Sequence, residues 1–314
     1  MGFLRYVPKY SVRDMADFLR NEKRSPASCE ADLAGKTTVI TGATSGIGLE
    51  TARLFASRGA SLVCCNRNAD KSRALEEELR DRHGTEVRTL LTDFSSLART
   101  RECAEALLAL KEPIDILIHN AGVYHTRRTF TPDGIEAVFQ VIHLASFYLN
   151  RILLDRLKKE DRARIVYVNS EGHRFALGGV HLDDLGWKRH VYTGLASYGA
   201  AKTAQLLTMA RFVELLGGSR VTINAMHPGN VKSHLGENNG RLYRWMKKTF
   251  ILSSARDPSI SAQALLHLAA AEELDGVTGQ FFNLTTPEKP APHALDPTLI
   301  EPVWLKSLEL CDLA

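Results

Sequence analysis

The stretch Thr37-Thr-Val-Ile-Thr-Gly-Ala-Thr-Ser-Gly-Ile-Gly-Leu-Glu50 joins a run of β-branched residues to three closely spaced glycines. The run from Thr37 to Thr41 is short and is followed at once by glycine, which predicts a buried strand and then a sharp turn. A helical pattern of apolar residues starts at Ile47. The glycines therefore lie between the end of a strand and the N-terminus of a helix.

The three glycines, Gly42, Gly46 and Gly48, predict a binding loop for the pyrophosphate of a dinucleotide. Free backbone N–H groups at the N-terminus of a helix attract such an anion. The spacing is Gly-x-x-x-Gly-x-Gly, which differs from the common fingerprint Gly-x-Gly-x-x-Gly. A glycine-rich connector without a ligand is the alternative that this loop alone leaves open.

The rest of the chain alternates between predicted strands and helices. The strands are expected at residues 37–41, 61–65, 86–92, 114–119, 164–169, 221–226 and 279–283. The helices are expected from residue 47 and at residues 70–82, 97–110, 134–158, 197–216, 259–270 and 299–310. This alternation predicts an α/β fold with one Rossmann-type, doubly wound parallel sheet, helices on both faces and ligands at the carboxyl ends of the strands.

We divide the chain into three parts. They are an N-terminal extension (residues 1–34), a dinucleotide-binding catalytic domain (residues 35–284) and a C-terminal tail with a terminal helix (residues 285–314). The extension has an amphipathic pattern over residues 12–19, which we expect to pack on the domain. Peripheral contact with a membrane surface stays open for this segment.

The composition bounds the class of protein. A chain of 314 residues with 44% hydrophobic and 24% charged residues is typical of a soluble protein with one large domain. The net charge of +4 comes without a block of Lys and Arg, so nucleic-acid binding is not expected. The longest uncharged stretches, residues 137–150 and 258–271, are shorter than the roughly 20 apolar residues that cross a bilayer.

The termini and cysteines give a further expectation about location. Residues 1–24 carry charges that interrupt the apolar core of a signal peptide. The five cysteines show neither metal-ligand spacing nor a disulfide framework. We therefore expect a cytoplasmic protein without a metal site.

The end of the second predicted strand bears on the choice of nicotinamide cofactor. It reads Cys64-Cys65-Asn66-Arg67-Asn68, at the place where an acidic residue would bind the free ribose 2′-hydroxyl of NAD. Arg67 instead offers a permanent planar cation that suits the 2′-phosphate of NADP. NADP(H) is therefore expected over NAD(H), with a solvated surface arginine as the alternative.

Tyr198 and Lys202 lie four residues apart at the start of a predicted helix, which places the phenol and the ammonium on one face. A tyrosine normally ionises near about pH 10, but a nearby cation stabilises the phenolate and makes Tyr198 a candidate proton carrier. Ser170 ends the preceding strand, where its hydroxyl can polarise a substrate carbonyl. The three residues fit hydride transfer, in which Tyr198 exchanges a proton with the substrate oxygen.

The loop from Thr41 to Gly48, the turn Asn120-Ala121-Gly122 and the set Ser170, Tyr198 and Lys202 together resemble the short-chain dehydrogenase/reductase family over residues 36 to 284. The resemblance implies the same catalytic roles for these three residues, with Lys202 also at the nicotinamide ribose. It also implies a set of cofactor-binding residues: Thr41, Gly42, Thr44, Ser45, Gly46, Ile47, Gly48, Arg67, Asp93, Asn120, Ala121, Gly122, Tyr198, Lys202, Pro228, Gly229, Val231 and Ser233.

Within this family, the segments 164–175 and 224–230 resemble the retinol dehydrogenase and WW-domain oxidoreductase branch, without WW modules in this sequence. The segment between Ser170 and Tyr198 is long, as in that branch. Its apolar residues are Phe175, Leu177, Trp187, Tyr192 and Leu195. Two interpretations stay open: the residues cover a lipophilic carbonyl or alcohol, or they pack the loop onto the protein.

Two residues depart from the family pattern. His119 replaces the first Asn of the usual double Asn before Ala121, and Ile142 stands where related enzymes carry an Asn that helps to hold a water near the catalytic lysine. Isoleucine has no side-chain donor or acceptor. We therefore expect slow proton resupply to Tyr198, unless backbone carbonyls or another polar side chain complete the relay.

The leading hypothesis is an NADP(H)-dependent enzyme that transfers hydride between nicotinamide and a small-molecule carbonyl or alcohol. A reductase of an activated carbon–carbon double bond is the second, because the same tyrosine and lysine can serve it. The third is a weakly active nucleotide-binding scaffold whose charged loop, residues 241–248, binds a protein partner. The sequence leaves the substrate, the direction and oligomer formation open.

Overall fold

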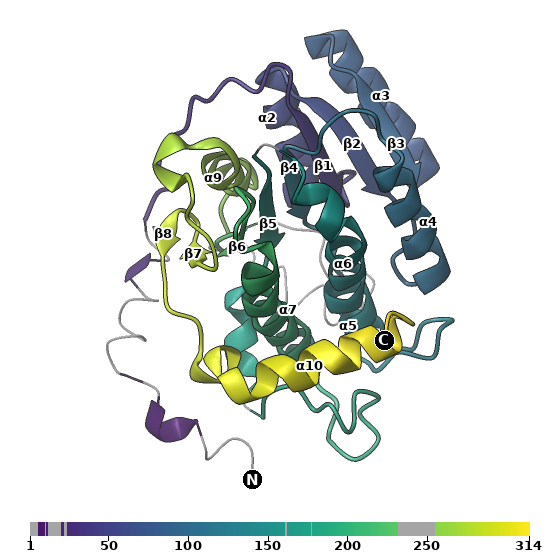
Figure 1. Ribbon diagram of the computed structural model, residues 1–314, viewed down its shortest axis with the longest axis vertical. Helices are drawn as coiled ribbons and strands as arrows, with labels where there is room; N and C mark the ends of the chain where they lie inside the picture. Colours follow the sequence, from purple (N-terminus) through teal and green to yellow (C-terminus); the bar gives the residue numbers. More distant parts are fainter. Residues whose placement is uncertain are drawn as a thin grey trace.

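Eight strands form one sheet in the computed structural model, which describes residues 6–9, 11, 20–21, 24–160, 162–176, 178–231 and 255–314 (Figure 1). The strands are β1 (Thr37–Thr41), β2 (Ser61–Asn66), β3 (Val87–Leu91), β4 (Ile116–His119), β5 (Arg164–Val168), β6 (Thr222–His227), β7 (Phe281–Asn283) and β8 (Thr286–Pro287). Their order is β3-β2-β1-β4-β5-β6-β7-β8. Neighbouring strands run parallel, except for the antiparallel pair β7 and β8. The direction of growth reverses between β1 and β4, as in a doubly wound sheet.

Helices cover both faces of this sheet (Figure 1). They are α2 (Gly46–Ser57), α3 (Ala69–His83), α4 (Leu97–Leu108), α5 (Ala137–Phe139), α6 (Ala145–Leu157), α7 (Gly194–Leu216), α9 (Ser259–Ala270) and α10 (Pro297–Leu310). Short helical turns are η2 (Val7–Lys9), η3 (Gln140–Leu144), η4 (Glu171–Phe175), η7 (Glu272–Leu274) and η8 (Pro292–Leu295). The predicted Rossmann-type fold is confirmed.

The alternation of side chains along β1 shows why both faces need a cover. Val39 packs into a cluster with α4, α6 and α7, whereas Ile40 packs into a cluster with α2, α3 and α9. All five residues of β1 are buried. A strand whose two faces are both buried needs a layer of helices on each side of the sheet.

Two predicted elements differ from the structure. The helix expected over residues 134–158 is divided into α5, the π-helical turn η3 and α6. A π turn carries one more residue than an α turn, so its carbonyl groups leave the regular ladder of hydrogen bonds. The sheet also continues beyond the last predicted strand, because β8 folds back antiparallel on β7.

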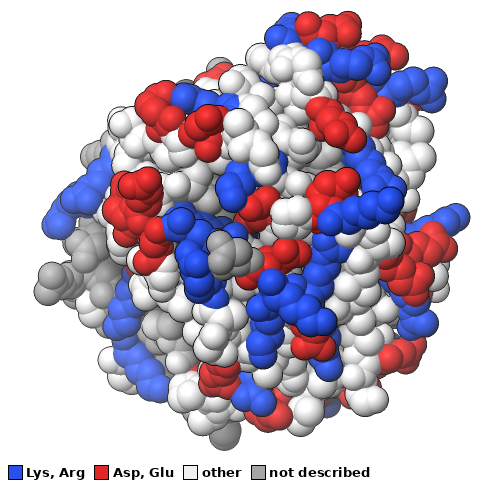
Figure 2. Space-filling view, turned by 45° about the horizontal axis from the view of Figure 1, so that its top comes forward, with Lys and Arg blue, Asp and Glu red and all other residues white. Residues whose placement is uncertain are grey.

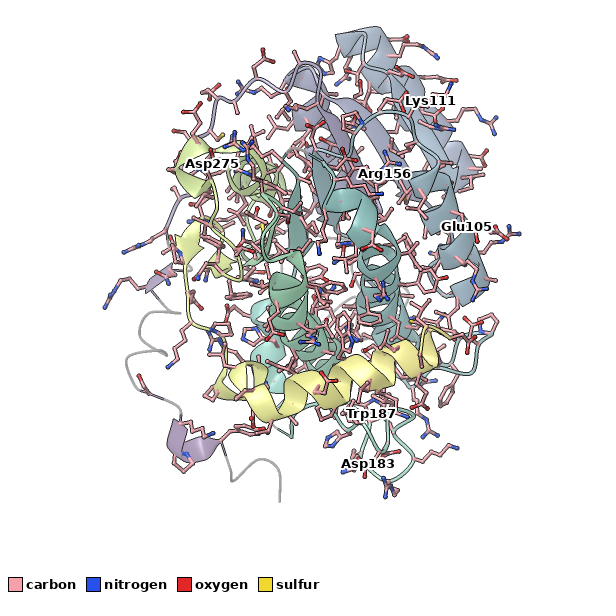
Figure 3. All side chains as sticks on the ribbon, viewed as in Figure 1. Glu105, Lys111, Arg156, Asp183, Trp187 and Asp275 are labelled. Carbon is pink, nitrogen blue, oxygen red and sulfur yellow. The ribbon has the colours of Figure 1, made fainter. Side chains whose placement is uncertain are left out.

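Figure 3 shows Arg156 of α6 beside the end of α4. Its guanidinium donates to the carbonyl oxygens of Leu107 at 2.7 Å, Leu108 at 2.8 Å and Glu112 at 2.6 Å. The last carbonyls of a helix have no partner within the helix. Arg156 therefore caps α4 and joins it to the neighbouring helix.

The run Ala137–Leu157 is the one helical stretch of the described residues that is long and apolar enough to cross a membrane. The fold buries 89% of its most apolar window, so it serves as a core helix here. On the face in Figure 2, Lys and Arg side chains alternate with Asp and Glu side chains.

The described parts of the N-terminal extension contact the C-terminal tail. The Tyr6 hydroxyl donates to Asp296 Oδ2 at 2.8 Å, and Asn21 Nδ2 donates to Glu288 Oε2 at 2.8 Å. The amphipathic pattern of residues 12–19 lies outside the described residues. The division of the chain at residues 34 and 284 stays a prediction.

The terminal helix α10 packs along α7 (Figure 1). Trp304 inserts between Phe147 of α6 and Phe212 of α7, with ring centroids 4.9 and 5.0 Å away. Both contacts are edge-to-face, the favoured geometry for aromatic pairs. Trp304 is 6% exposed, whereas its neighbour Leu305 is 55% exposed.

We predict that Trp304→Ala lowers the free energy of unfolding by about 3 kcal/mol, because it removes a buried ring and leaves a cavity. Leu305→Ala is the control on the same helix, and it should change the free energy by less than about 0.5 kcal/mol. Urea denaturation followed by circular dichroism measures both. Equal losses for the two variants would contradict the packing role of Trp304.

Candidate active site

The turn between β1 and α2 is packed too closely for side chains. Gly42 and Gly46 have φ values of +73° and +56°, in the left-handed region that glycine adopts at little cost. A Cβ on Gly48 would lie 2.2 Å from the Gly42 carbonyl oxygen and 2.5 Å from Asn120 Nδ2. Position 48 therefore admits only glycine without a change in the turn.

Asn120 fastens this turn to the end of β4. Its Nδ2 donates to the carbonyl oxygens of Thr41 at 3.1 Å and Gly42 at 2.8 Å. Thr41 Oγ1 in return accepts hydrogen bonds from the backbone N–H groups of Asn120 and Ala121, both at 3.0 Å. Residues that were predicted at two separate strand ends thus lie together.

The first turn of α2 offers backbone N–H groups to a ligand. Ser45 is the N-cap residue, and its side chain makes no capping hydrogen bond. The first N–H groups of a helix, here from Gly46 and Ile47 onward, have no acceptor within the helix and can bind an anion. Thr44 precedes Ser45 in the same turn. This arrangement fits the pyrophosphate of a nicotinamide dinucleotide.

Two predicted cofactor contacts follow the neighbouring strands. Arg67 comes directly after β2, and its exposed guanidinium makes no ion pair within the part of the chain that the structure describes. Asp93 follows β3, and its Oδ1 accepts hydrogen bonds from the backbone N–H of Ser95 at 3.0 Å and the Ser95 hydroxyl at 2.7 Å. The Asp93 carboxylate is therefore fixed at the same edge of the sheet.

The segment after β6 supplies the last predicted contacts. Gly229 has a φ of +76°, and the Pro228 carbonyl oxygen accepts a hydrogen bond from Ser261 Oγ at 2.6 Å. Val231 forms an isolated β-bridge with Arg256. Ser233 lies outside the described residues, as does the charged loop 241–248.

Ser170 and the Tyr198 ring both lie next to Gly172. Ser170 is the N-cap of η4, where its Oγ accepts a hydrogen bond from the Gly172 N–H at 2.9 Å. A Cβ on Gly172 would lie 2.6 Å from Tyr198 Cε1 and 3.1 Å from Ser170 Oγ. The absence of a side chain at residue 172 therefore lets the tyrosine ring lie against the serine turn. The sequence analysis missed this glycine, although it directly follows the Ser-Glu pair.

Lys202 lies one turn after Tyr198 on α7. Its Nζ is 5.6 Å from the centroid of the Tyr198 ring and donates to the Val168 carbonyl oxygen at 2.7 Å. The side chain is only 4% exposed, and burial lowers the pKa of Lys202 to about 7. The expected proximity of phenol and ammonium is present. Tyr124, which the sequence analysis also missed, adds an edge-to-face ring contact to Tyr198 at 5.8 Å.

The two departures from the family pattern have structural explanations. His119 is buried, its Nε2 lies 2.7 Å from Asn150 Oδ1, and burial lowers its pKa to about 4, so it is a neutral core residue. The Ile142 side chain is also buried, but its backbone carbonyl accepts a hydrogen bond from Gln205 Nε2 at 2.9 Å. The expectation of slow proton resupply held only if no other polar side chain completes the relay. Gln205 is such a side chain, and it contacts the backbone at position 142.

The long segment between Ser170 and Tyr198 divides its apolar residues between two roles. Trp187, labelled in Figure 3, is buried and packs edge-to-face on Tyr192 at 5.7 Å. Its carbonyl oxygen accepts a hydrogen bond from Arg128 Nη1 at 2.6 Å. Phe175 and Leu195 are exposed at the two ends of the segment. Packing onto the protein therefore accounts for Trp187 and Tyr192, but not for Phe175 and Leu195. Leu177 lies outside the described residues.

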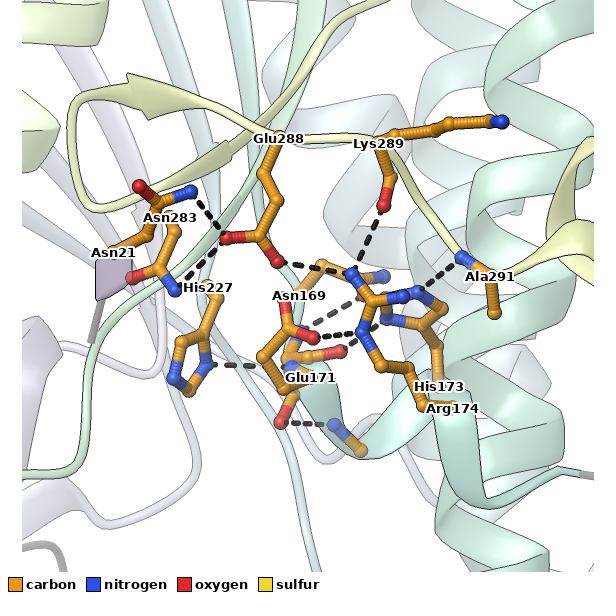
Figure 4. A network of polar contacts seen from close by, with 12 residues as sticks. Asn21, Asn169, Glu171, His173, Arg174, His227, Asn283, Glu288, Lys289 and Ala291 are labelled. Carbon is orange, nitrogen blue, oxygen red and sulfur yellow. Dashed lines mark hydrogen bonds and ion pairs between the residues drawn. The ribbon is translucent and has the colours of Figure 1, made fainter. Parts of the chain in front are cut away.

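A buried polar network holds the turn that follows Ser170 (Figure 4). Arg174 forms ion pairs with Glu171 and with Glu288, the latter at 2.9 Å. Glu288 Oε2 also accepts a hydrogen bond from Asn283 Nδ2 at 3.2 Å. The Arg174 guanidinium is thus the ion-pair partner of two carboxylates. Burial raises the pKa of Glu171 to about 7.

The comparisons with known proteins agree with this geometry. A family model described as short chain dehydrogenase matches residues 36–180. Retinol dehydrogenase 13 of Homo sapiens is 35% identical over 291 residues, which cover 90% of this chain and 87% of the relative. The WW domain-containing oxidoreductase of Homo sapiens is 33% identical over 290 residues, which cover 89% and 69%. The chain therefore belongs to the short-chain dehydrogenase/reductase family, whose members are NAD(P)-dependent oxidoreductases.

Solved structures share the fold. An uncharacterized protein from Mycobacterium paratuberculosis is 27% identical with a TM-score of 0.72, covering 93% of this chain and 97% of that one. A Shigella flexneri short chain dehydrogenase with NADP (TM-score 0.65, coverage 82% and 99%) and a 7α-hydroxysteroid dehydrogenase with NADH (TM-score 0.64, coverage 83% and 97%) are each 21% identical. Fold similarity thus includes complexes with either cofactor.

We predict that Glu171 makes stability depend on pH. The carboxyl loses its proton at about pH 4.3 in the unfolded chain and at about 7 in the folded chain. The folded state binds more protons between these values, so this contribution to stability falls as pH rises through the window. Glu171→Gln removes this pH-dependent contribution to stability. The melting temperature of the variant minus that of the wild type should therefore increase from pH 5 to pH 7.5.

Differential scanning fluorimetry across that pH range measures the difference between the two proteins. Glu102→Gln is the matched control, because Glu102 is exposed on α4 and pairs only with Arg99 among the described residues. Its difference from the wild type should not vary with pH. A pH-independent difference for Glu171→Gln would show that Glu171 titrates as an ordinary carboxyl.

Proposed function

We propose that this protein is an NADP(H)-dependent oxidoreductase that acts on a lipophilic carbonyl or alcohol, with Tyr198 as proton donor and acceptor. The observation that carries the proposal is the contact of Ser170, Gly172 and Tyr198, with Lys202 buried under the tyrosine ring. These groups lie at the carboxyl end of β5, where doubly wound sheets bind ligands.

The cofactor would be held by the β1–α2 turn, Arg67, Asp93, the Asn120–Gly122 turn, Lys202 and the Pro228–Val231 segment. When bound, nicotinamide supplies or accepts the hydride. The protein then needs a proton donor for the substrate oxygen and a group to polarise the carbonyl.

Ser170 and Tyr198 can supply these two functions. The Ser170 oxygen accepts the Gly172 N–H, which leaves its own O–H free to donate to a carbonyl oxygen. Tyr198 gives a proton to the same oxygen during reduction and takes it back during oxidation. The Lys202 ammonium stabilises the phenolate that remains.

Arg67 supports NADP over NAD. Its guanidinium is exposed directly after β2, and no acidic residue lies between Cys64 and Asn68 to bind a free ribose 2′-hydroxyl. A planar cation without an ion-pair partner among the described residues suits a phosphate better than a hydroxyl.

The proposed lipophilic substrate depends on the margin of the site. Phe175 and Leu195 lie near the two ends of the segment between Ser170 and Tyr198, Val191 lies between them in the sequence, and all three side chains are exposed. Exposed apolar side chains at the rim of a polar site favour substrates with an apolar part.

We predict that Arg67→Ala weakens NADPH binding by about tenfold or more, the effect of losing one charge-assisted hydrogen bond. NADH binding should stay nearly unchanged, because NADH has no 2′-phosphate. Arg73→Ala, on the exposed face of α3, is the control. Cofactor fluorescence titration measures the dissociation constants, and an equal loss for both cofactors would remove Arg67 from the phosphate site.

We predict that Tyr198→Phe abolishes turnover but leaves NADPH affinity nearly intact, because the phenol oxygen acts on the substrate. Tyr148→Phe is the control, because the Tyr148 hydroxyl accepts only a hydrogen bond from Arg101 Nε among the described residues and none from Ser170, Tyr198 or Lys202. The assay follows NADPH oxidation with aldehydes, ketones and enones. Turnover restricted to enones would favour double-bond reduction, and substantial turnover by Tyr198→Phe would contradict its proton-transfer role.

A further inference from the structure

The Gln205 side chain lies between the catalytic lysine and the π turn. It is 2% exposed. Its Oε1 accepts hydrogen bonds from Asn169 Nδ2 at 3.1 Å and from Lys202 Nζ at 3.4 Å. Its Nε2 donates to the Ile142 carbonyl oxygen at 2.9 Å and to Ser146 Oγ at 3.1 Å. Both donors and both lone pairs of the carboxamide are therefore used.

The irregular helix explains why the Ile142 carbonyl is available. Residues 140–144 form the π turn η3, in which carbonyl groups leave the regular ladder. Gln205 and the Ser146 hydroxyl both direct donors at this region, with Ser146 Oγ 2.9 Å from the Ile142 oxygen. A backbone group at position 142 thus makes the polar contact that its isoleucine side chain cannot make.

The position of the carboxamide matters because Lys202 is a buried cation. Its ammonium has three N–H donors, and the Val168 carbonyl and Gln205 Oε1 accept two of them. A buried charge needs such acceptors, since each lost partner costs more than in water. Asn169 in turn holds the Gln205 oxygen and, through its Oδ1, the Ser170 N–H at 2.8 Å.

We propose that Gln205 is a positioning residue, which orients the Lys202 ammonium toward Tyr198 and anchors it through the carbonyl of Ile142. Gln205 in this way takes over the polar contact for which Ile142 has no side-chain group. The inference rests on the proposed function of Tyr198 and Lys202. No proton moves through the carboxamide; it holds the ammonium that stabilises the phenolate.

The test variant is Gln205→Met, which keeps the length of the side chain and removes its hydrogen bonds. We expect kcat at pH 7 to fall about tenfold, the effect of one lost hydrogen bond to a charged group. We also expect the ionisation seen in the pH profile of kcat for alcohol oxidation to move to higher pH, because a less well held ammonium stabilises the phenolate less. KM should change little, since the Gln205 side chain is buried and all its hydrogen bonds are to other residues of the protein.

Thr208→Val is the matched control. Thr208 is buried one turn further along α7, and its hydroxyl donates to the backbone carbonyl oxygens of Ala204 at 3.0 Å and Gln205 at 3.3 Å, without a hydrogen bond to Lys202 or to the Gln205 carboxamide. It should lower the melting temperature but leave the pH profile unmoved. If Gln205→Met behaves in the same way, Gln205 has a packing role only and the proposal is overturned.

The variant Ile142→Asn is a second test of the proposed role of Gln205. With Gln205 in place, an added carboxamide at position 142 should not raise kcat in a folded protein. A several-fold rise would show that Gln205 does not fill the role and would overturn the proposal.

A double-variant cycle of Gln205→Met with Lys202→Met, read from urea denaturation, tests the contact without turnover. We expect the midpoint loss of the double variant to be smaller than the sum of the two single losses. Additive losses would overturn the proposed contact. A different outcome is also decisive: the wild-type protein oxidises no NADPH with any carbonyl compound of the panel, but the cycle is non-additive. This outcome would contradict the proposed function and keep the Gln205–Lys202 interaction.

Discussion

The close approach of Gly48 to the Gly42 carbonyl and to Asn120 is the constraint on which the rest of the structure depends. It sets the β1–α2 turn directly against the end of β4, with Thr41 and Asn120 exchanging hydrogen bonds. The first strand therefore cannot shift relative to its neighbour. Since strands β4 and β5 pair in register, the same constraint fixes where Ser170 emerges from the sheet.

A second close contact sets the position of α7. A Cβ added to Gly199 of α7 would lie 2.7 Å from the Gly172 carbonyl oxygen, and a Cβ added to Gly172 would lie 2.6 Å from Tyr198 Cε1. The turn after β5 and the start of α7 are thus joined through two glycines. A methyl group at either position would push the serine turn away from the tyrosine, so the close approach of Ser170 and Tyr198 depends on the absence of side chains at residues 172 and 199.

Local patterns were sufficient to predict the glycine turn, the alternation of strands and helices and the Tyr198–Lys202 pair, because each depends on neighbours within a few residues. Tertiary contacts were not predictable in this way. Gln205 follows Lys202 by three residues, a spacing that indicates a shared helix face, but its contact with Ile142 joins residues 63 apart. The pairing of Arg174 with Glu288 spans 114 residues. Whether the predicted residues bind cofactor stays a prediction.

The segment 169–174 is held from both sides, and this arrangement leaves one group free to act. On the side of α7, Asn169 contacts Gln205 and the Lys202 carbonyl. On the other side, His173 is fixed as the neutral Nδ1–H tautomer, because its Nδ1 meets the Ser170 carbonyl oxygen at 2.7 Å and its Nε2 accepts the Ala291 N–H at 3.0 Å. The backbone of Ser170 is therefore bound at both its N–H and its carbonyl. In the proposed function, its hydroxyl hydrogen is the polar group that donates to the substrate oxygen.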